Sequence, residues 1–134
     1  MRVIPRRNIV HYKGELADIL DTIIRGGLKD GPYIKEFEEQ FAKYIGTSFA
    51  IAVASGRLGL YLILESLSLD RKSQVILPAY TDESVPGIVE ELGLEPVFVD
   101  IDKRDHNIDS NLIKDKLSDR SKVIIATHIF GRPC

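Results

Sequence analysis

Residues Gln74–Asp102, QVILPAYTDESVPGIVEELGLEPVFVDID, combine two strand signals and one helix signal in a short span. Gln74–Leu77 and Pro96–Val99 are short apolar runs typical of buried strands. Between them, the sequence from about Asp82 to Leu92 favours a helix. Strand, helix and strand in this order predict two parallel strands joined by a helical crossover.

The same alternation continues on both sides of this stretch. Phe49–Ala54 predicts a buried strand, and the helix that follows it to about Leu67 is apolar on nearly every side, so we expect it to be deeply buried. Further on, Asp109 is a predicted N-cap of a helix, and Lys122–Ala126 predicts a fourth strand. The pattern predicts an α/β fold in three layers, with a mainly parallel sheet and helices on both faces.

Two amphipathic helices precede the alternating part. Apolar residues recur at helical spacing from Leu16 to Ile24 and again from Ile34 to Ile45, where Gly46 is a predicted C-cap. Residues 1–13 show no clear period and are interpreted as an extended arm. The expected organisation is therefore an arm, 1–13, followed by one domain, 14–134.

Composition excludes several classes of protein. The 134 residues carry a net charge of −2, which gives no electrostatic case for nucleic acid or an anionic membrane as the main partner. The apolar runs are far shorter than the ~20 residues of a membrane span, and no signal peptide is recognised, so a cytoplasmic protein is expected. Cys134 is the single cysteine, and the three histidines have no metal-binding spacing, so no disulfide and no metal site are expected.

Ligands of parallel α/β sheets bind beyond the carboxyl ends of the strands. The predicted strands make four loops candidates: Ser55–Arg57, Ala79–Asp82, Asp100–Asp102 and Thr127–Phe130. In the first loop, Gly56 permits a tight turn into a helix whose N-terminal amides favour an anion such as phosphate, and Arg57 adds a guanidinium. The alternative is that Ser55 is only a helix cap and Gly56 only a turn.

The other three loops give weaker signals. In one interpretation of the second loop, Tyr80 or Thr81 faces a ligand. The favoured local alternative is that Asp82 caps a helix and the aromatic ring is simply packed. The acidic stretch Asp100–Asp105 lacks the pattern of a calcium loop and is interpreted as a solvated turn. His128 is the one histidine placed at the carboxyl end of a predicted strand.

Five blocks occur in an order and spacing typical of one enzyme family. They are GPYIKEFEEQFAKYIG at Gly31–Gly46, AVASG at Ala52–Gly56, VILPAYT at Val75–Thr81, PVFVDID at Pro96–Asp102 and HIFGRP at His128–Pro133. Together they resemble the DegT/DnrJ/EryC1/StrS sugar aminotransferases over about residues 14–134. The resemblance implies the N-terminal half of the large domain of a fold-type-I enzyme, which uses pyridoxal 5′-phosphate to move an amino group onto a nucleotide-linked keto sugar.

The resemblance also implies roles for particular residues. Ser55, Gly56 and Arg57 match the loop that holds the cofactor phosphate, and Asp82 occupies the position of an aromatic ring that lies against the pyridine face. Leu28–Pro32 matches a segment near the active site. Arg57 stands where the family usually has threonine, so a guanidinium replaces a hydroxyl, and a carboxylate at Asp82 cannot stack.

In the family, the acid that pairs with the pyridine nitrogen and the Schiff-base lysine both lie beyond the position that matches Cys134. None of the nine lysines sits in a matching lysine motif. The chain alone is therefore expected to be inactive, with no catalytic residue of its own. Family enzymes are dimers with active sites near the subunit interface, so the resemblance implies a homo-oligomer.

Three interpretations of the chain remain open at this stage. It is a truncated, split or fragmentary aminotransferase, which a complementary C-terminal chain would complete; or a non-catalytic interaction or regulatory module that kept the fold; or an unrelated flavodoxin-like ligand-binding domain. The last leaves the five ordered blocks unexplained. The sugar, the amino donor and the pathway do not follow from the sequence.

Overall fold

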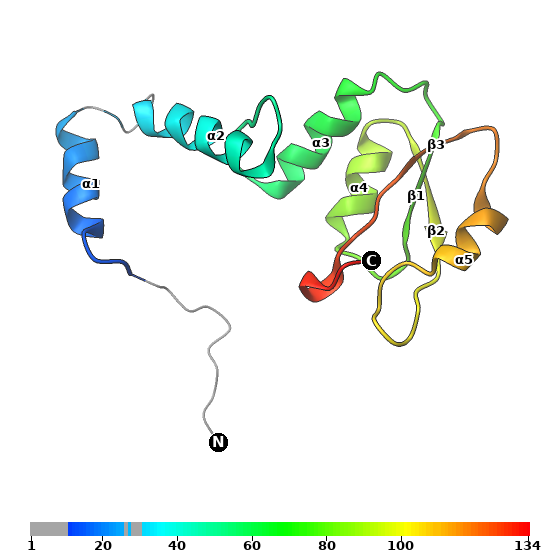
Figure 1. Cartoon of the computed structure of the whole chain (residues 1–134). Coiled ribbons are helices and arrows are strands. Elements are labelled where there is room, and N and C mark those ends of the chain that lie inside the picture. Colours follow the sequence, from blue (N-terminus) through cyan, green and yellow to red (C-terminus); the bar gives the residue numbers. More distant parts are fainter. Residues whose placement is uncertain (1–10, 26, 28–30) are drawn as a thin grey trace. The chain divides into compact units, whose positions relative to one another are not determined.

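The computed structural model describes residues 11–25, 27 and 31–134. The chain divides into two compact units, Met1–Ala52 and Val53–Cys134, which are described separately below (Figure 1). Most of the expected arm, residues 1–10, and most of the Leu28–Pro32 loop lie outside the described residues.

The first unit contains the two predicted helices, α1 (Glu15–Ile24) and α2 (Pro32–Ile45). Pro32 stands at the start of α2, where its missing N–H costs no helical hydrogen bond. Gly46 ends α2 in the left-handed conformation with φ of 82°, and its N–H donates to the Ala42 carbonyl. The predicted C-cap is therefore confirmed.

The two helices of this unit bury very little apolar surface. Ala42 is their single buried residue. A hydrogen bond of 2.5 Å from Tyr33 Oη to Asp21 Oδ2 joins α2 to α1. The large apolar side chains are largely exposed: Leu16, Ile19, Leu20, Ile23, Ile24, Ile34, Phe37, Phe41, Tyr44 and Ile45. The sequence pattern correctly predicts helices here, and the described residues of the unit do not bury their apolar faces.

The predicted strand at Phe49–Ala54 is wrong for this structure. The segment has no regular secondary structure, and Phe49 and Ile51 are 85% and 79% exposed. Its backbone bonds to side chains in place of a neighbouring strand: the Ala52 N–H donates to Glu38 Oε1 at 2.7 Å, and the Phe49 carbonyl accepts the Thr47 hydroxyl at 3.1 Å. Apolar composition alone therefore overpredicted a strand.

The second unit is built on a three-stranded parallel sheet of order β2-β1-β3. The strands are β1 (Gln74–Pro78), β2 (Glu95–Val99) and β3 (Ser121–Ile124). Val75 pairs with Pro96 on one side and Val123 on the other. All five residues of the central strand are buried, as the continuous apolar run predicts.

Helices cover both faces of this sheet, which confirms the predicted fold class (Figure 1). They are α3 (Gly56–Ser66), α4 (Ser84–Glu91) and α5 (Ser110–Ile113), with short 3₁₀ helices η1 (Lys114–Lys116) and η2 (Ile129–Gly131). Val75 and Leu77 pack with Leu64 of α3 and Val89 of α4. Ile76, on the opposite face, packs with Val99, Ile108 and Ile113 of α5.

The expectation that the helix after Ser55 is deeply buried is wrong. In α3 only Leu64 is buried, while Leu58, Leu62 and Ile63 are 42%, 43% and 62% exposed. The reason is geometric: α3 shares one face of a narrow sheet with α4, so only one side of the helix meets the core. A helix with apolar residues on all sides is fully buried only when other elements pack against its remaining faces.

Candidate site at the carboxyl edge of the sheet

Ser55 begins α3 as the predicted N-cap. Its Oγ accepts the Leu58 N–H at 3.2 Å, and its carbonyl accepts the Gly59 N–H at 3.0 Å. The backbone N–H groups of the first helical positions, Gly56 and Arg57, have no partner within a helix, and the helix dipole adds partial positive charge there. A Cβ added at Gly56 would meet nothing within 4 Å, so the side-chain direction of this glycine faces open space.

Asp82, from the loop after β1, lies in the electrostatic reach of Arg57. The pKa of Asp82 is lowered mainly because Ser84 donates its hydroxyl and its N–H (3.0 Å) to the carboxylate, and the Arg57 charge lowers it further. An open pocket between α3 and α4 is lined by Arg57, Tyr61, Ser84 and Glu91, among others. The structure therefore brings together the first candidate loop and the end of the second.

Asp82 is held as a turn-forming acid in front of α4. The N-cap position of α4 is Glu83, so Asp82 is not the helix cap that the local interpretation favoured. Its Oδ1 instead accepts the N–H and the hydroxyl of Ser84, the first residue of α4, in a turn just before the helix. The lowered pKa favours the ionised carboxylate, and the side chain has no aromatic ring. The donor set at Ser55–Arg57 fits an anion such as phosphate, whereas Asp82 does not fit the role of a ring that stacks on a pyridine.

Aromatic residues from three loops meet at the carboxyl edge of the sheet. The Tyr80 ring centroid lies 6.2 Å from that of His106 and 6.4 Å from that of Phe130. Tyr80 follows β1, His106 follows β2, and Phe130 follows β3. The topological argument correctly brings these loops together, although the sequence singled out His128 rather than His106.

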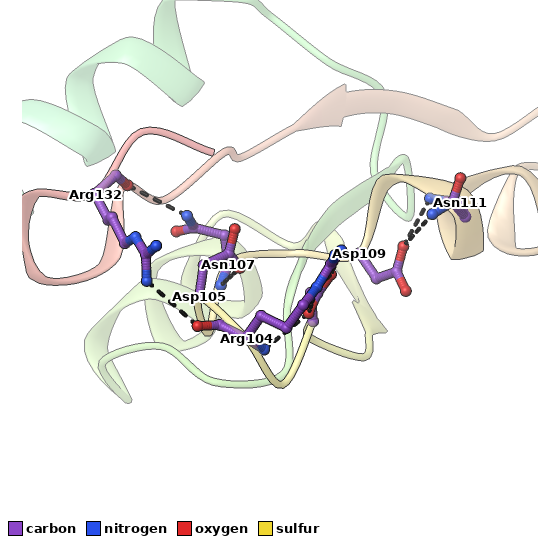
Figure 2. A network of polar contacts seen from close by, with 7 residues as sticks. Arg104, Asp105, Asn107, Asp109, Asn111 and Arg132 are labelled. Atoms are coloured by element: carbon purple, nitrogen blue, oxygen red, sulfur yellow. Dashed lines mark hydrogen bonds and ion pairs between the residues drawn. The ribbon is translucent and has the colours of Figure 1, made fainter.

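Asn107 fixes two of these loops to each other. Its side chain is almost completely buried: Oδ1 accepts the Ile129 N–H at 3.0 Å, and Nδ2 donates to the carbonyls of Arg132 and Pro133 at 3.3 and 3.2 Å. Figure 2 shows the amide of Asn107 pointing to the Arg132 segment. No sequence signal distinguished this asparagine, because asparagine in a polar turn is common.

Ion pairing stabilises the same turn from outside. Arg104 binds Asp102 through Nε and Nη2, with a shortest distance of 2.5 Å, and its backbone N–H donates to the same carboxylate. These bonds lower the pKa of Asp102 from its ordinary 3.8 to about 2. Arg132 Nη1 donates to the Arg104 carbonyl at 3.3 Å, as Figure 2 shows. The acidic stretch is thus a solvated turn, as predicted, in which Asp102 and Arg104 pair with each other.

His128 forms a hydrogen bond with the backbone of Cys134. Its Nδ1 accepts the Cys134 N–H at 3.1 Å. This contact occupies the ring nitrogen with a backbone group, and the structure gives His128 no ring partner among the aromatic pairs of the described residues. Among the described residues, no helix is both long and apolar enough to cross a membrane.

Comparisons with known proteins give a consistent result. The sequence model of the DegT/DnrJ/EryC1/StrS aminotransferase family matches residues 10–134. An uncharacterised protein of Methanocaldococcus jannaschii is 38% identical over 120 residues, which are 90% of this chain and 31% of that protein. The dTDP-3-amino-3,4,6-trideoxy-alpha-D-glucose transaminase of Micromonospora megalomicea is 30% identical over 128 residues, 92% of this chain and 34% of that protein.

A solved structure shows the same fold. The GDP-4-keto-6-deoxy-D-mannose-3-dehydratase of E. coli, with bound hydrated pyridoxal phosphate, superimposes with a TM-score of 0.88. It is 28% identical in sequence, and the match covers 95% of this chain and 34% of that one. The chain thus spans about a third of the length of the relatives it matches.

Proposed function

The chain belongs to the DegT/DnrJ/EryC1/StrS aminotransferase family, and from that premise we propose that it is the first part of an enzyme that aminates a nucleotide-linked keto sugar. Its cofactor is pyridoxal 5′-phosphate, and its product serves sugar or cell-surface polysaccharide biosynthesis. The Micromonospora relative, a dTDP-sugar transaminase, supports the substrate class. The E. coli neighbour, whose bound group is the same cofactor, supports the cofactor.

The observation that carries the proposal is the start of α3, where a capped helix N-terminus lies next to an arginine. Ser55 caps the helix, Gly56 leaves the approach free, and Arg57 adds a permanent positive charge. In the proposed enzyme the amides of Gly56 and Arg57 bind the cofactor phosphate, and the guanidinium balances its charge. The cofactor itself supplies an electron sink for the carbanion formed during amino-group transfer.

Asp82 belongs to this site in a different role from the one its position in the family suggests. Its carboxylate is held by Ser84 and interacts with Arg57. We assign it the task of orienting the Arg57 guanidinium, and no stacking on the cofactor ring. A negative charge beside a bound phosphate is unfavourable, so this task requires Arg57 to lie between the two anions.

The proposal also covers which further polypeptide the chain assembles with and in which compartment it acts. The exposed apolar side chains of α1, α2 and α3 need a covering surface. We propose that further polypeptide supplies it, as a complementary C-terminal chain and a second subunit of a homodimer. We also propose that the protein acts in the cytoplasm.

The chain alone is proposed to lack the lysine that forms the covalent bond to the cofactor. The test is incubation with pyridoxal phosphate, reduction with borohydride, and mass mapping of the nine lysines. We expect only scattered, substoichiometric labelling and no amino transfer from glutamate. Stoichiometric labelling of one lysine would contradict this assignment, and restored amino transfer on adding a complementary C-terminal chain would support the proposed function.

A further inference from the structure

Polar side chains join the starts of the three strands, at the edge of the sheet opposite to the candidate site. They belong to Gln74, Glu95, Ser118, Arg120 and Ser121, called here the amino-edge group. Gln74 begins the central strand β1 and is 8% exposed. Its Nε2 donates to Glu95 Oε1 at 3.1 Å, and its Oε1 accepts the hydroxyls of Ser118 and Ser121 at 2.6 and 3.3 Å. One buried amide therefore contacts the beginnings of both neighbouring strands.

Arg120 closes this group from the outside. Its Nη1 donates to Glu95 Oε2 at 2.5 Å and to the Lys72 carbonyl at 3.4 Å, while its own carbonyl accepts the Gln74 N–H at 2.7 Å. Hydrogen bonds from Gln74 and Arg120 lower the pKa of Glu95, which favours the ionised carboxylate that both donors bind. The turn before β3 is thus fixed to β1 and β2 by side-chain and backbone bonds.

The pairing of β3 with β1 is irregular beside this group. Gln74 pairs with Ser121, whereas the next residue of β1, Val75, pairs with Val123. The pairing therefore skips Lys122, which is an extra residue in β3, as in a β-bulge. Bulges are rare between parallel strands, and they are specified features of a fold rather than defects. This one consequently requires a physical cause.

Two sets of contacts hold β3, and they are out of phase by one residue. The amino-edge group holds Ser121 opposite Gln74. The apolar core under α3 and α4 holds Val123, which packs against it. Successive side chains of a strand point to opposite faces of the sheet, so regular pairing onward from Ser121 would turn Val123 away from this core. Regular pairing backward from Val123 would instead place Lys122 opposite Gln74.

We propose that the amino-edge group is a conformational latch: it holds β3 in the bulged register, and its release moves the turn before β3 by one residue, so that Lys122 pairs with Gln74. The position of Val123 is unchanged, because the core holds it independently of the group. Among the described residues, β3 lies at an edge of the sheet. A bulge interrupts the regular row of backbone groups along such an edge. The latch therefore keeps the amino end of this edge irregular.

The backbone N–H of residue 74 distinguishes the two registers. It donates to the Arg120 carbonyl in the bulged register and to the Ser121 carbonyl in the released one. NMR couplings across hydrogen bonds, measured on the whole chain labelled with ²H, ¹³C and ¹⁵N, identify the acceptor. We expect Arg120 as acceptor in the unaltered chain and Ser121 in Gln74→Leu, which removes the amide and keeps a side chain of similar size. The coupling from the Ile125 N–H to the Ile76 carbonyl is expected in both.

Three further variants separate the latch from general stability. The double variant Gln74→Glu with Glu95→Gln exchanges the amide and the acid, and it is expected to restore Arg120 as acceptor. Ile88→Val is the matched control, because Ile88 lies in the same core on α4 and cannot form a hydrogen bond to the group. It is expected to lower stability and to keep Arg120 as acceptor. Ser118→Ala removes the 2.6 Å bond at an exposed residue and is expected to show both acceptors.

Each outcome supports or overturns the latch. Ser121 as acceptor in Gln74→Leu, with Arg120 restored in the double variant, supports it. Arg120 as acceptor in Gln74→Leu overturns it, because the bulge then persists without the group. Loss of the Ile125 coupling in that variant also overturns it, since β3 then leaves the sheet, and so does release of the bulge in Ile88→Val. If Gln74→Leu does not fold, Ser118→Ala decides, and Arg120 as its single acceptor contradicts the latch.

Discussion

The helical unit and the sheet unit differ in how much of their apolar surface they bury for themselves. In Met1–Ala52 the helices carry one buried residue, Ala42, although both have clear apolar faces. In Val53–Cys134 the three central residues Val75, Ile76 and Leu77 are completely buried. Helical periodicity therefore identifies the apolar face of a helix without showing that it is buried, whereas a parallel strand is buried by the crossover helices that connect it to its neighbours.

The largest expected difference between the two units is in how substitutions of a buried strand residue and of an exposed helix residue change the free energy of unfolding. Leu77→Ala removes a side chain with no solvent exposure and is expected to lower the free energy of unfolding by about 2–5 kcal/mol. Leu20→Ala, at a side chain 58% exposed on α1, is expected to change it by less than about 0.5 kcal/mol. Native-state hydrogen exchange measures both units separately. Equal losses at the two positions would contradict the comparison.

Side-chain hydrogen bonds in the two units test the same contrast, with a smaller expected effect on stability. Asn107→Ala leaves the Ile129 N–H and two carbonyls without their buried partner, so we expect a loss of about 1–3 kcal/mol. The control is Tyr33→Phe, which removes the exposed bond to Asp21 in the helical unit and is expected to leave the urea midpoint unchanged. If Asn107→Ala also leaves the urea midpoint unchanged, the hydrogen bonds of Asn107 do not stabilise the turn that carries Phe130.

How far the sequence determined these results depends on the range of the interactions. Local signals were sufficient for α2, which ends at Gly46, for the N-caps at Ser55 and Asp109, and for the three paired strands. Phe49–Ala54 was wrong because an apolar run does not reveal whether a neighbouring strand is present. Asn107 was missed because its partners are 22 to 26 residues away in the sequence.

The candidate site was predictable to a similar extent. The rule for parallel sheets placed the loops after β1, β2 and β3 at one edge, and the aromatic pairs lie there. The rule says nothing about which side chains of a loop point together, so Tyr80 was considered while His106 and Phe130 were not paired with it. Electrostatic coupling between Arg57 and Asp82 also required the folded chain.

A third test compares helix starts in the two units. Ser55→Ala removes the side-chain cap of α3 and is expected to cost about 1 kcal/mol. In α2 the preceding residue is Gly31, which gives no side-chain cap, so Gly31 has no such contribution to lose. Thermal unfolding followed by circular dichroism measures the Ser55→Ala effect, and Ser55→Asp, which restores a capping oxygen, is expected to recover most of it. Failure of that recovery would point to a role for Ser55 other than capping.

The smallest expected effect is on the stability of the sheet unit at acidic pH. Arg104 lowers the pKa of Asp102 to about 2, below its ordinary 3.8, so the contribution to stability is fully present above about pH 4 and is lost as the pH falls towards 2. Asp102→Asn is expected to make the acid-induced loss of stability in the sheet unit shallower across this range. Asp21, whose pKa is lowered mainly by Tyr33 and also by Arg25, is the counterpart in the helical unit, and Asp21→Asn is expected to leave the sheet unit's acid limb unchanged. A slope that Asp102→Asn does not alter would contradict the pairing with Arg104.

The central claim is that the start of α3 binds the phosphate of the family's cofactor, and titration of inorganic phosphate into ¹⁵N-labelled chain tests it most directly. The account predicts saturable shifts of the Gly56 and Arg57 amides, weakened by Arg57→Ala and absent for the N-terminal amides of α2, where Pro32 removes a donor. Shifts of equal size at both helix starts, or an affinity that Arg57→Ala leaves unchanged, would contradict it.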